Sequence, residues 1–136
     1  MKREWIEVVT YEEEGYAPVI DFEQWRVAVL NYCEELEIQN ITSMQKHNET
    51  DEVFVLLKGN CTLFTGGAES EISEIDAIKM EPLKFYNVKK GVYHTHTLDT
   101  EGSVLIVENR NTCDENSTTK VLTKEQLSAL YQANIV

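Results

Sequence analysis

Residues 45–59, QKHNETDEVFVLLKG, decide the fold of this chain. From Glu52 onward, valine, leucine and phenylalanine form a short extended run that ends at Gly59, a pattern typical of a strand followed by a turn. Because side chains alternate along a strand, Phe54 and Leu56 are expected to share the inward face with Glu52. The stretch therefore predicts a strand that carries one carboxylate toward the interior of the fold.

Other segments show the same alternation of short apolar runs and turns. Residues 58–60, Lys-Gly-Asn, have the composition of a hairpin turn between residues 52–57 and a second strand at 61–65. The same pattern predicts further strands at 25–32, 41–46, 72–80, 83–88, 92–97 and 103–109. Many short strands with little helix predict an all-β barrel or sandwich.

Two places favour helix. Residues 33–37 contain helix formers for a single turn, and Asp21 offers an N-cap that would make residues 25–32 helical instead of extended. Thr123 and Gln126 fit the capping-box pattern, and Leu127, Leu130 and Tyr131 follow at helical spacing. We expect a strand at 25–32 and a short helix at the C-terminal end.

Composition and charge limit the classes of partner. The 136 residues are 42% hydrophobic, which suits one domain with one core. The formal net charge of -12 would repel nucleic-acid phosphates and anionic lipid, so neither nucleic acid nor a membrane is an expected partner. The N-terminal residues lack the apolar stretch of a secretory signal, and a cytoplasmic location is expected. Cys33, Cys61 and Cys113 show no metal or redox spacing and are expected to be idle thiols.

Two segments resemble the motifs of the cupin superfamily. The first cupin motif has His-x-His, three or four residues, glutamate, six further residues and then glycine; Gln45, His47, Glu52 and Gly59 match it except at the first histidine. The second motif has Pro-x-Gly-x-x-His, and residues 89–94, Lys-Lys-Gly-Val-Tyr-His, keep the glycine and the histidine. Lys89 replaces the proline, and Leu98 replaces a following asparagine.

The resemblance implies a fold and a domain layout. A cupin is a double-stranded β-helix, or jelly-roll barrel, and here a short C-terminal helix would follow it. The single domain, 1–136, would have N-terminal strands and a short helical turn in 1–40. The barrel with both motifs would occupy 41–110, and the helix 120–134.

The resemblance also implies a divalent transition-metal site. Its ligands would be His47, Glu52 and His94, with Gln45 where cupins have a further histidine. Imidazole and carboxylate donors suit manganese, iron, nickel or zinc, and three ligands leave coordination positions open. The amide oxygen of Gln45 is a weaker donor than imidazole toward late transition metals, which favours lower affinity or a harder ion such as manganese. The identity of the metal stays open.

Other polar residues are candidates for catalysis or substrate binding. His96 is two residues from His94 and is expected to face the same pocket, where it would serve as a fourth ligand, a general acid or base, or a substrate contact. Glu52 is a second candidate for proton transfer. Substrate contacts are expected at Arg26, which would pair with an anion, and at the aromatic residues Tyr86 and Tyr93; Lys89 and Lys90 lie at the lip of the pocket.

Three functions are compatible with these residues. One is a metal-dependent enzyme acting on a small polar metabolite by isomerase, lyase or dioxygenase-type chemistry. The second is a metal-free module that binds a sugar or an organic acid. The third is structural: His47, Glu52 and His94 would be a hydrogen-bonded cluster that only satisfies buried polar groups.

A homodimer is also expected. If Phe54 and Leu56 face inward, then Val53, Val55 and Leu57 face outward, and residues 104–107, Val-Leu-Ile-Val, have the same two-sided apolar character. These outer faces need a cover, which the N-terminal segment, the terminal helix or a second copy of the chain would supply.

Overall fold

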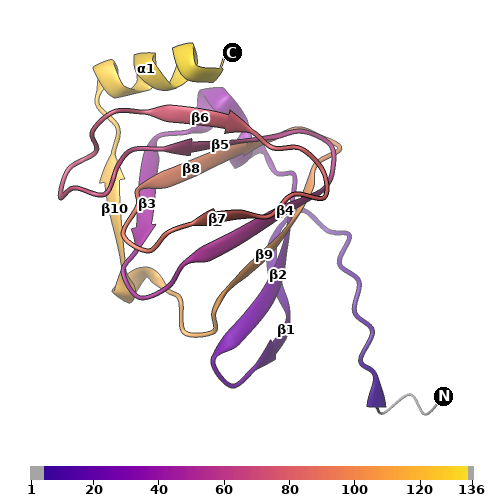
Figure 1. The fold of residues 1–136 in the computed structure, drawn as a ribbon. Helices are drawn as coiled ribbons and strands as arrows, with labels where there is room; N and C mark the ends of the chain where they lie inside the picture. The colour runs from indigo at the N-terminus through magenta and orange to yellow at the C-terminus, as the bar shows by residue number, and fades with distance from the viewer. Residues whose placement is uncertain (1–4, 135–136) are drawn as a thin grey trace.

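In the computed structural model, which describes residues 5–134, ten strands form two five-stranded antiparallel sheets packed face to face (Figure 1). The first sheet has the order β1 (Gly15–Phe22), β2 (Trp25–Asn31), β9 (Ser103–Asn109), β4 (Glu52–Lys58) and β7 (Tyr86–Val88). The second has the order β10 (Ser117–Val121), β3 (Ser43–His47), β8 (His94–Leu98), β5 (Cys61–Thr65) and β6 (Asp76–Lys79). The expected all-β jelly roll with a short C-terminal helix, α1 (Lys124–Asn134), is confirmed.

The main core lies between the two sheets, because every second side chain of a strand faces the opposite sheet. In β4, Glu52, Phe54 and Leu56 are buried while Val53 and Val55 are half-buried, as the alternation predicted. Phe54 and Leu56 pack in one cluster with buried residues of β2, β5, β8 and β9. Glu52 therefore enters the interior from the end of an otherwise apolar strand.

A second core lies on the far side of the second sheet. Phe64 of β5 and Met44 of β3 are fully buried there, packed with Leu130 of α1. The predicted capping box starts this helix: the Gln126 amide donates to Thr123 Oγ1 (3.1 Å) and the Thr123 amide donates to Gln126 Oε1 (2.9 Å). The helix thus covers the outer face of the second sheet.

The hairpin predicted at residues 58–60 is wrong. β4 pairs with β9 and β7, whereas β5 pairs with β8 and β6, so the turn carries the chain from one sheet to the other. Gly59 has φ +76°, and a Cβ there would lie 2.5 Å from the Gly102 Cα. The glycine was a correct sign of a tight turn, but turn composition does not specify which strands pair.

Several strand boundaries also differ from the expectations. The strand expected at 72–80 forms only over β6, whose four residues are exposed. β1 and β10 were not predicted as strands, and residues 120 and 121, assigned to the terminal helix, pair with β3 instead. The segment 25–32 is the strand β2, and a short 3-10 turn, Glu34–Leu36, lies in the predicted helical turn.

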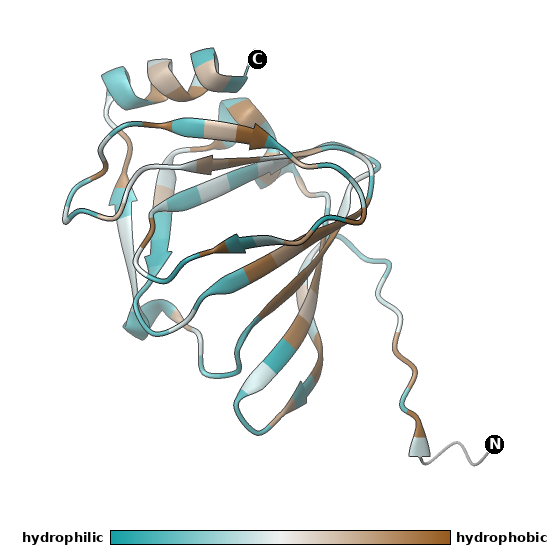
Figure 2. Ribbon diagram, viewed as in Figure 1, coloured by the Kyte–Doolittle hydropathy of each residue, from teal (hydrophilic) through white to brown (hydrophobic). Residues whose placement is uncertain are grey.

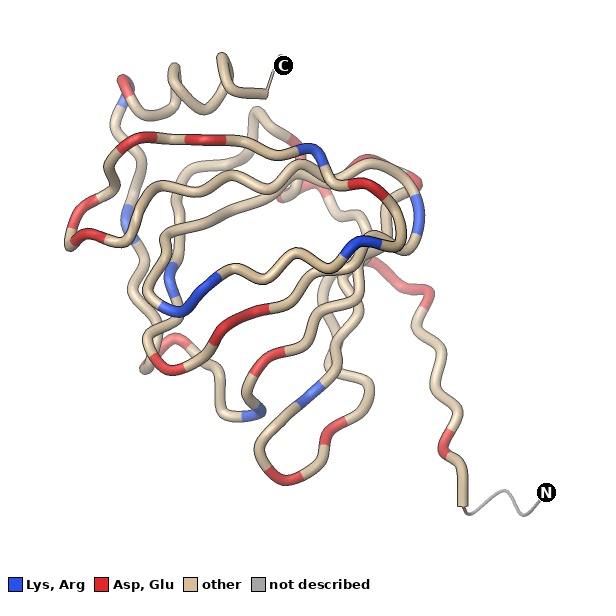
Figure 3. The backbone as a smooth tube through the Cα atoms, in the orientation of Figure 1, with Lys and Arg blue, Asp and Glu red and all other residues tan. Residues whose placement is uncertain are grey.

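Along the described backbone, acidic and basic residues lie mainly in the loops and near the ends of the strands (Figure 3). Among the described residues, none of the helices combines the length and apolarity needed to cross a bilayer.

Replacing Leu130 by alanine tests the second core. Leu130 is 0% exposed, so the change should remove buried contacts and lower the free energy of unfolding by about 2–5 kcal/mol. The control is Val121→Ala. Val121 is 78% exposed, so this change should alter the free energy of unfolding by less than about 0.5 kcal/mol. Urea unfolding measures both, and equal effects would mean that α1 does not pack as described.

Candidate metal centre

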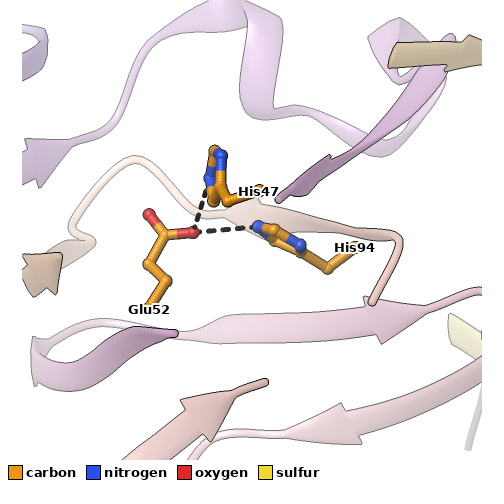
Figure 4. A group of neighbouring side chains, drawn as sticks. All are labelled: His47, Glu52 and His94. Atoms are coloured by element: carbon orange, nitrogen blue, oxygen red, sulfur yellow. Dashed lines mark hydrogen bonds and ion pairs between the residues drawn. The ribbon is translucent and has the colours of Figure 1, made fainter. Parts of the chain in front are cut away.

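Three strands bring His47, Glu52 and His94 together (Figure 4). Glu52 comes from the first sheet, and the two histidines come from β3 and β8 of the second. Their Nε2 atoms lie 3.1 Å (His47) and 2.9 Å (His94) from the same carboxylate oxygen, Glu52 Oε1. All three residues are buried. The convergence expected from the sequence is therefore present in the structure.

The outer nitrogen of each ring has a partner of its own. His94 Nδ1 lies 3.0 Å from the carbonyl oxygen of Val92, and His47 Nδ1 lies 2.8 Å from Ser117 Oγ. A carbonyl oxygen only accepts hydrogen bonds, so His94 Nδ1 must carry a hydrogen. In a neutral ring the lone pair of His94 Nε2 then faces the Glu52 carboxylate. That contact is repulsive unless a proton or a metal ion lies between the two atoms.

The pKa shifts of Glu52 and His47 also show that this carboxylate is stabilised by positive charge beside it. Burial alone would raise the pKa of Glu52, but hydrogen bonds and attraction from His47 and His94 outweigh it and lower that pKa well below 4.5. For His47, burial would lower the pKa, and the hydrogen bond and charge of Glu52 raise it above 6.5. The carboxylate is thus held ionised and attracts a cation.

The donor set fits a divalent metal ion. The three ligand atoms lie within 4.8 Å of one another. Two ligands about 2.1 Å from one ion and about 90–109° apart are about 3.0–3.4 Å from each other, close to the separations from Glu52 Oε1. The hydrogen bonds that the outer nitrogens share with the Val92 carbonyl oxygen and with Ser117 Oγ orient the rings, as the partners of metal-binding histidines do. The group could therefore hold a metal ion.

Gln45 and His96 lie beside the cluster without joining it. Both line a hollow of about 180 Å³ together with the three cluster residues. The Gln45 amide nitrogen donates to Thr119 Oγ1 (3.3 Å) and more weakly to Asp114 Oδ1 (3.5 Å), so this side chain is directed to β10. The ring of His96 packs on Phe54, and its buried Nδ1 has no hydrogen-bond partner within residues 5–134.

A second polar cluster, which the sequence analysis missed, lies across the larger cavity of about 410 Å³ that His47, Glu52 and His96 also line. Glu108 Oε2 accepts hydrogen bonds from Tyr16 Oη (2.7 Å) and from Arg26 Nη2 (2.8 Å) and Nε (3.2 Å). Arg26 also donates to two backbone carbonyl oxygens. The guanidinium predicted to pair with an anionic substrate is therefore bound to Glu108.

The structure does not bring Tyr86, Tyr93 or the two lip lysines into this cavity. Tyr93 is fully buried in the second core, and its hydroxyl donates to the Ser70 carbonyl. Tyr86 packs against the main core and accepts a hydrogen bond from the Glu81 amide. Lys89 and Lys90 are exposed next to Asp51. Tyr93 precedes His94, so on a regular strand it faces the opposite side.

His96 makes the stability of the metal-free protein depend on pH. Burial lowers its pKa from 6.5 to about 4, so below pH 6.5 the unfolded chain takes up a proton that the folded chain excludes. Relative to the His96→Gln variant, the wild type should lose about 3 kcal/mol of stability between pH 6.5 and 4 and nothing between pH 7 and 9. Urea unfolding of both proteins in chelator measures this; a difference independent of pH would contradict the burial of a neutral ring.

Comparisons with known proteins find solved structures of similar fold. No family model matches the chain, and no curated protein matches it in sequence. A cupin-2 domain-containing protein from Shewanella frigidimarina is 17% identical, with 74% of this chain and 85% of that chain covered and a TM-score of 0.52. The QdtA 3,4-ketoisomerase from Thermoanaerobacterium thermosaccharolyticum, in complex with TDP, is 20% identical, with 73% of this chain and 68% of that chain covered and a TM-score of 0.54.

A third solved structure extends the comparison to a ligand of another kind. A variant of Streptomyces PAC13 with uridine is 8% identical, with 85% of each chain covered and a TM-score of 0.58. At these identities the likeness concerns the fold alone. Together with the two motifs and the two five-stranded sheets, it shows that the chain has the fold of the cupin superfamily.

Proposed function

We propose that the chain binds one divalent transition metal through His47, Glu52 and His94 and acts on a small polar metabolite in the adjoining cavity. The observation that carries the proposal is the pair of imidazole nitrogens directed at one buried carboxylate oxygen, 2.9 and 3.1 Å away. Since His94 Nδ1 is committed to the Val92 carbonyl, its other nitrogen is free to bind an ion as a neutral ring.

The proposed metal would supply Lewis acidity, polarising a carbonyl or hydroxyl oxygen of the substrate. Manganese, iron, nickel and zinc all accept this mixture of imidazole and carboxylate. Three protein ligands leave positions open on the ion, so a substrate oxygen has room beside them. Isomerase, lyase and dioxygenase-type reactions all use such a site.

We assign proton transfer to His96 in preference to Glu52. Glu52 is engaged by both histidines, which keep it ionised. His96 lines both cavities, its buried Nδ1 has no hydrogen-bond partner within residues 5–134, and burial lowers its pKa to about 4, so at pH 7 the ring is neutral with a lone pair that would take a proton only in contact with a bound substrate. Glu108, oriented by Tyr16 and Arg26, is proposed to accept a hydrogen bond from a substrate hydroxyl. In this assignment Arg26 positions Glu108 and does not bind an anion.

The second candidate function is a binding module that captures its ligand without converting it. The orientation of Gln45 favours it, because the amide directed at Thr119 leaves only three protein ligands at the cluster. The similar folds are seen with TDP and with uridine, which supports a small polar ligand in either case. The expected cytoplasmic location stays a prediction.

Metal analysis of protein purified without added metal tests the proposal. The wild type should hold about one transition-metal ion per chain, and His94→Ala or Glu52→Gln should lower the affinity more than tenfold, because each removes a direct ligand. The control is Tyr16→Phe, which removes a hydroxyl that lines the same cavity and bonds to Glu108, leaves every cluster ligand in place, and should keep its metal. Wild-type protein that binds no metal on titration with manganese, iron, nickel or zinc would contradict the proposal.

Adding the missing imidazole should strengthen the site. Gln45 shares the inward face of β3 with His47 and pairs with His94 across the strands, so Gln45→His places a fourth nitrogen at the edge of the cluster. We expect at least a tenfold gain in zinc affinity, measured by competition with a chromophoric chelator. The control, Thr119→His on β10, should give no gain; an equal affinity in Gln45→His and wild type would place residue 45 out of reach of the ion.

A further inference from the structure

Two loops carry the chain from one sheet to the other beside the metal cluster. Residues 48–51, the first crossing loop, connect β3 to β4 and so join His47 to Glu52. Residues 89–93, the second crossing loop, connect β7 to β8 and lead to His94. The position of one loop relative to the other therefore affects the distance between Glu52 and the histidines of the opposite sheet.

Backbone pairing holds the second crossing loop only in part. The ladder between β4 and β7 ends at the pair of Glu52 with Val88. Past Val88, the Gly91 amide donates to the His47 carbonyl oxygen (2.7 Å), which ties this loop to the end of β3. A separate contact is needed to tie it to the start of β4.

The side chain of Asp51 makes that contact. Asp51 Oδ1 accepts a hydrogen bond from the Lys90 amide (2.8 Å), and Oδ2 accepts one from Asn87 Nδ2 (3.1 Å). We call the carboxylate and its two donors the Asp51 clamp. It joins the residue directly before Glu52 to the segment that leads to His94.

The Asp51 carboxylate lies on the other side of the chain from the cluster. Its side chain is 43% exposed, whereas that of Glu52 is 8% exposed. Successive side chains of an extended segment face opposite sides, so the two carboxylates point apart. Figure 2 shows this boundary, with hydrophilic residues where β4 begins and a hydrophobic strand beyond them. Any effect of the clamp on a bound ion must act through the position of Glu52.

We infer that Asp51 is a positioning residue of the metal centre, which holds the two crossing loops together and thereby keeps Glu52 within reach of His47 and His94. The inference rests on the proposed metal site. Ligands that already have their bound arrangement bind an ion more tightly, because no free energy is spent on ordering them. Without the clamp, the ion would have to restore the arrangement of the loops itself.

The far end of the barrel contains a matched clamp. Asp99 Oδ1 accepts a hydrogen bond from the Asn60 amide (3.1 Å), and Asp99 Oδ2 accepts one from Asn60 Nδ2 (2.8 Å). Asn60 follows the end of β4 and Asp99 follows the end of β8, whereas Glu52 and His94 begin these strands. Asp99 therefore makes the same kind of contact away from the cluster, and its removal measures the effect of losing a clamp on stability alone.

Zinc affinity, measured by competition with a chromophoric chelator, tests the inference. Asp51→Ala removes both acceptors and should weaken zinc binding about tenfold or more. Asp51→Asn should stay within about threefold of the wild type, because its oxygen still accepts from Lys90 and its amide donates to Asn87 once the Asn87 amide turns over. This variant lacks the negative charge, so it separates positioning of the loops from simple attraction of the cation.

The control Asp99→Ala should lower the free energy of unfolding as Asp51→Ala does, while keeping zinc affinity within about threefold of the wild type. Wild-type affinity in Asp51→Ala overturns the inference and leaves the proposed metal site intact. Equal losses of affinity in Asp51→Asn and Asp51→Ala, or in Asp99→Ala and Asp51→Ala, overturn it as well. A wild type that does not bind zinc or the other three metals contradicts the proposed function itself.

Amide hydrogen exchange of the metal-free protein in chelator tests the clamp independently of the ion. The Lys90 amide should exchange about fivefold or more faster in Asp51→Ala than in the wild type, and Asp51→Asn should resemble the wild type. An unchanged rate in Asp51→Ala overturns the clamp whether or not the protein binds metal.

Discussion

The polar part of the barrel interior is organised around one carboxylate oxygen, Glu52 Oε1, which is negatively charged and buried. Glu52 Oε1 faces two imidazole nitrogens, and one of those rings has its hydrogen fixed on the far side by the Val92 carbonyl. Only a cation between these atoms makes the contact attractive. A cluster that served only to satisfy hydrogen bonds would need a proton in that place, whereas a metal ion would satisfy all three groups with neutral rings.

The sequence predicted those features of the site that follow from strand alternation. Phe54 and Leu56 face the core with Glu52, and the period of two along β4 is sufficient to predict this. The same alternation along β9 also indicates a buried acidic residue. Glu108 shares the buried face of β9 with Val104 and Ile106, so a lone acidic residue in that apolar strand was a sign of an interior polar contact. Tyr93 precedes His94 and turns to the opposite side.

Pairing between distant strands could not be predicted in this way. Gly59 indicates a tight turn in both a hairpin and a sheet-to-sheet crossing, and only the partners of β4 and β5 distinguish them. The commitment of Arg26 to Glu108 joins residues that are 82 positions apart in the chain. An isolated arginine on a strand looks the same in sequence whether it is free to bind a ligand or neutralised by a buried carboxylate.

The origin of the three cluster residues has a kinetic consequence. Glu52 belongs to one sheet, and His47 and His94 belong to the other. An ion bound by all three would act as a clasp between the layers, and it would escape only when a ligand rotates away or the layers move apart. The dissociation rate of the bound ion would then report how often the two sheets separate. A substitution that weakens the apolar contact between the sheets would shorten the lifetime of the bound ion without changing any ligand.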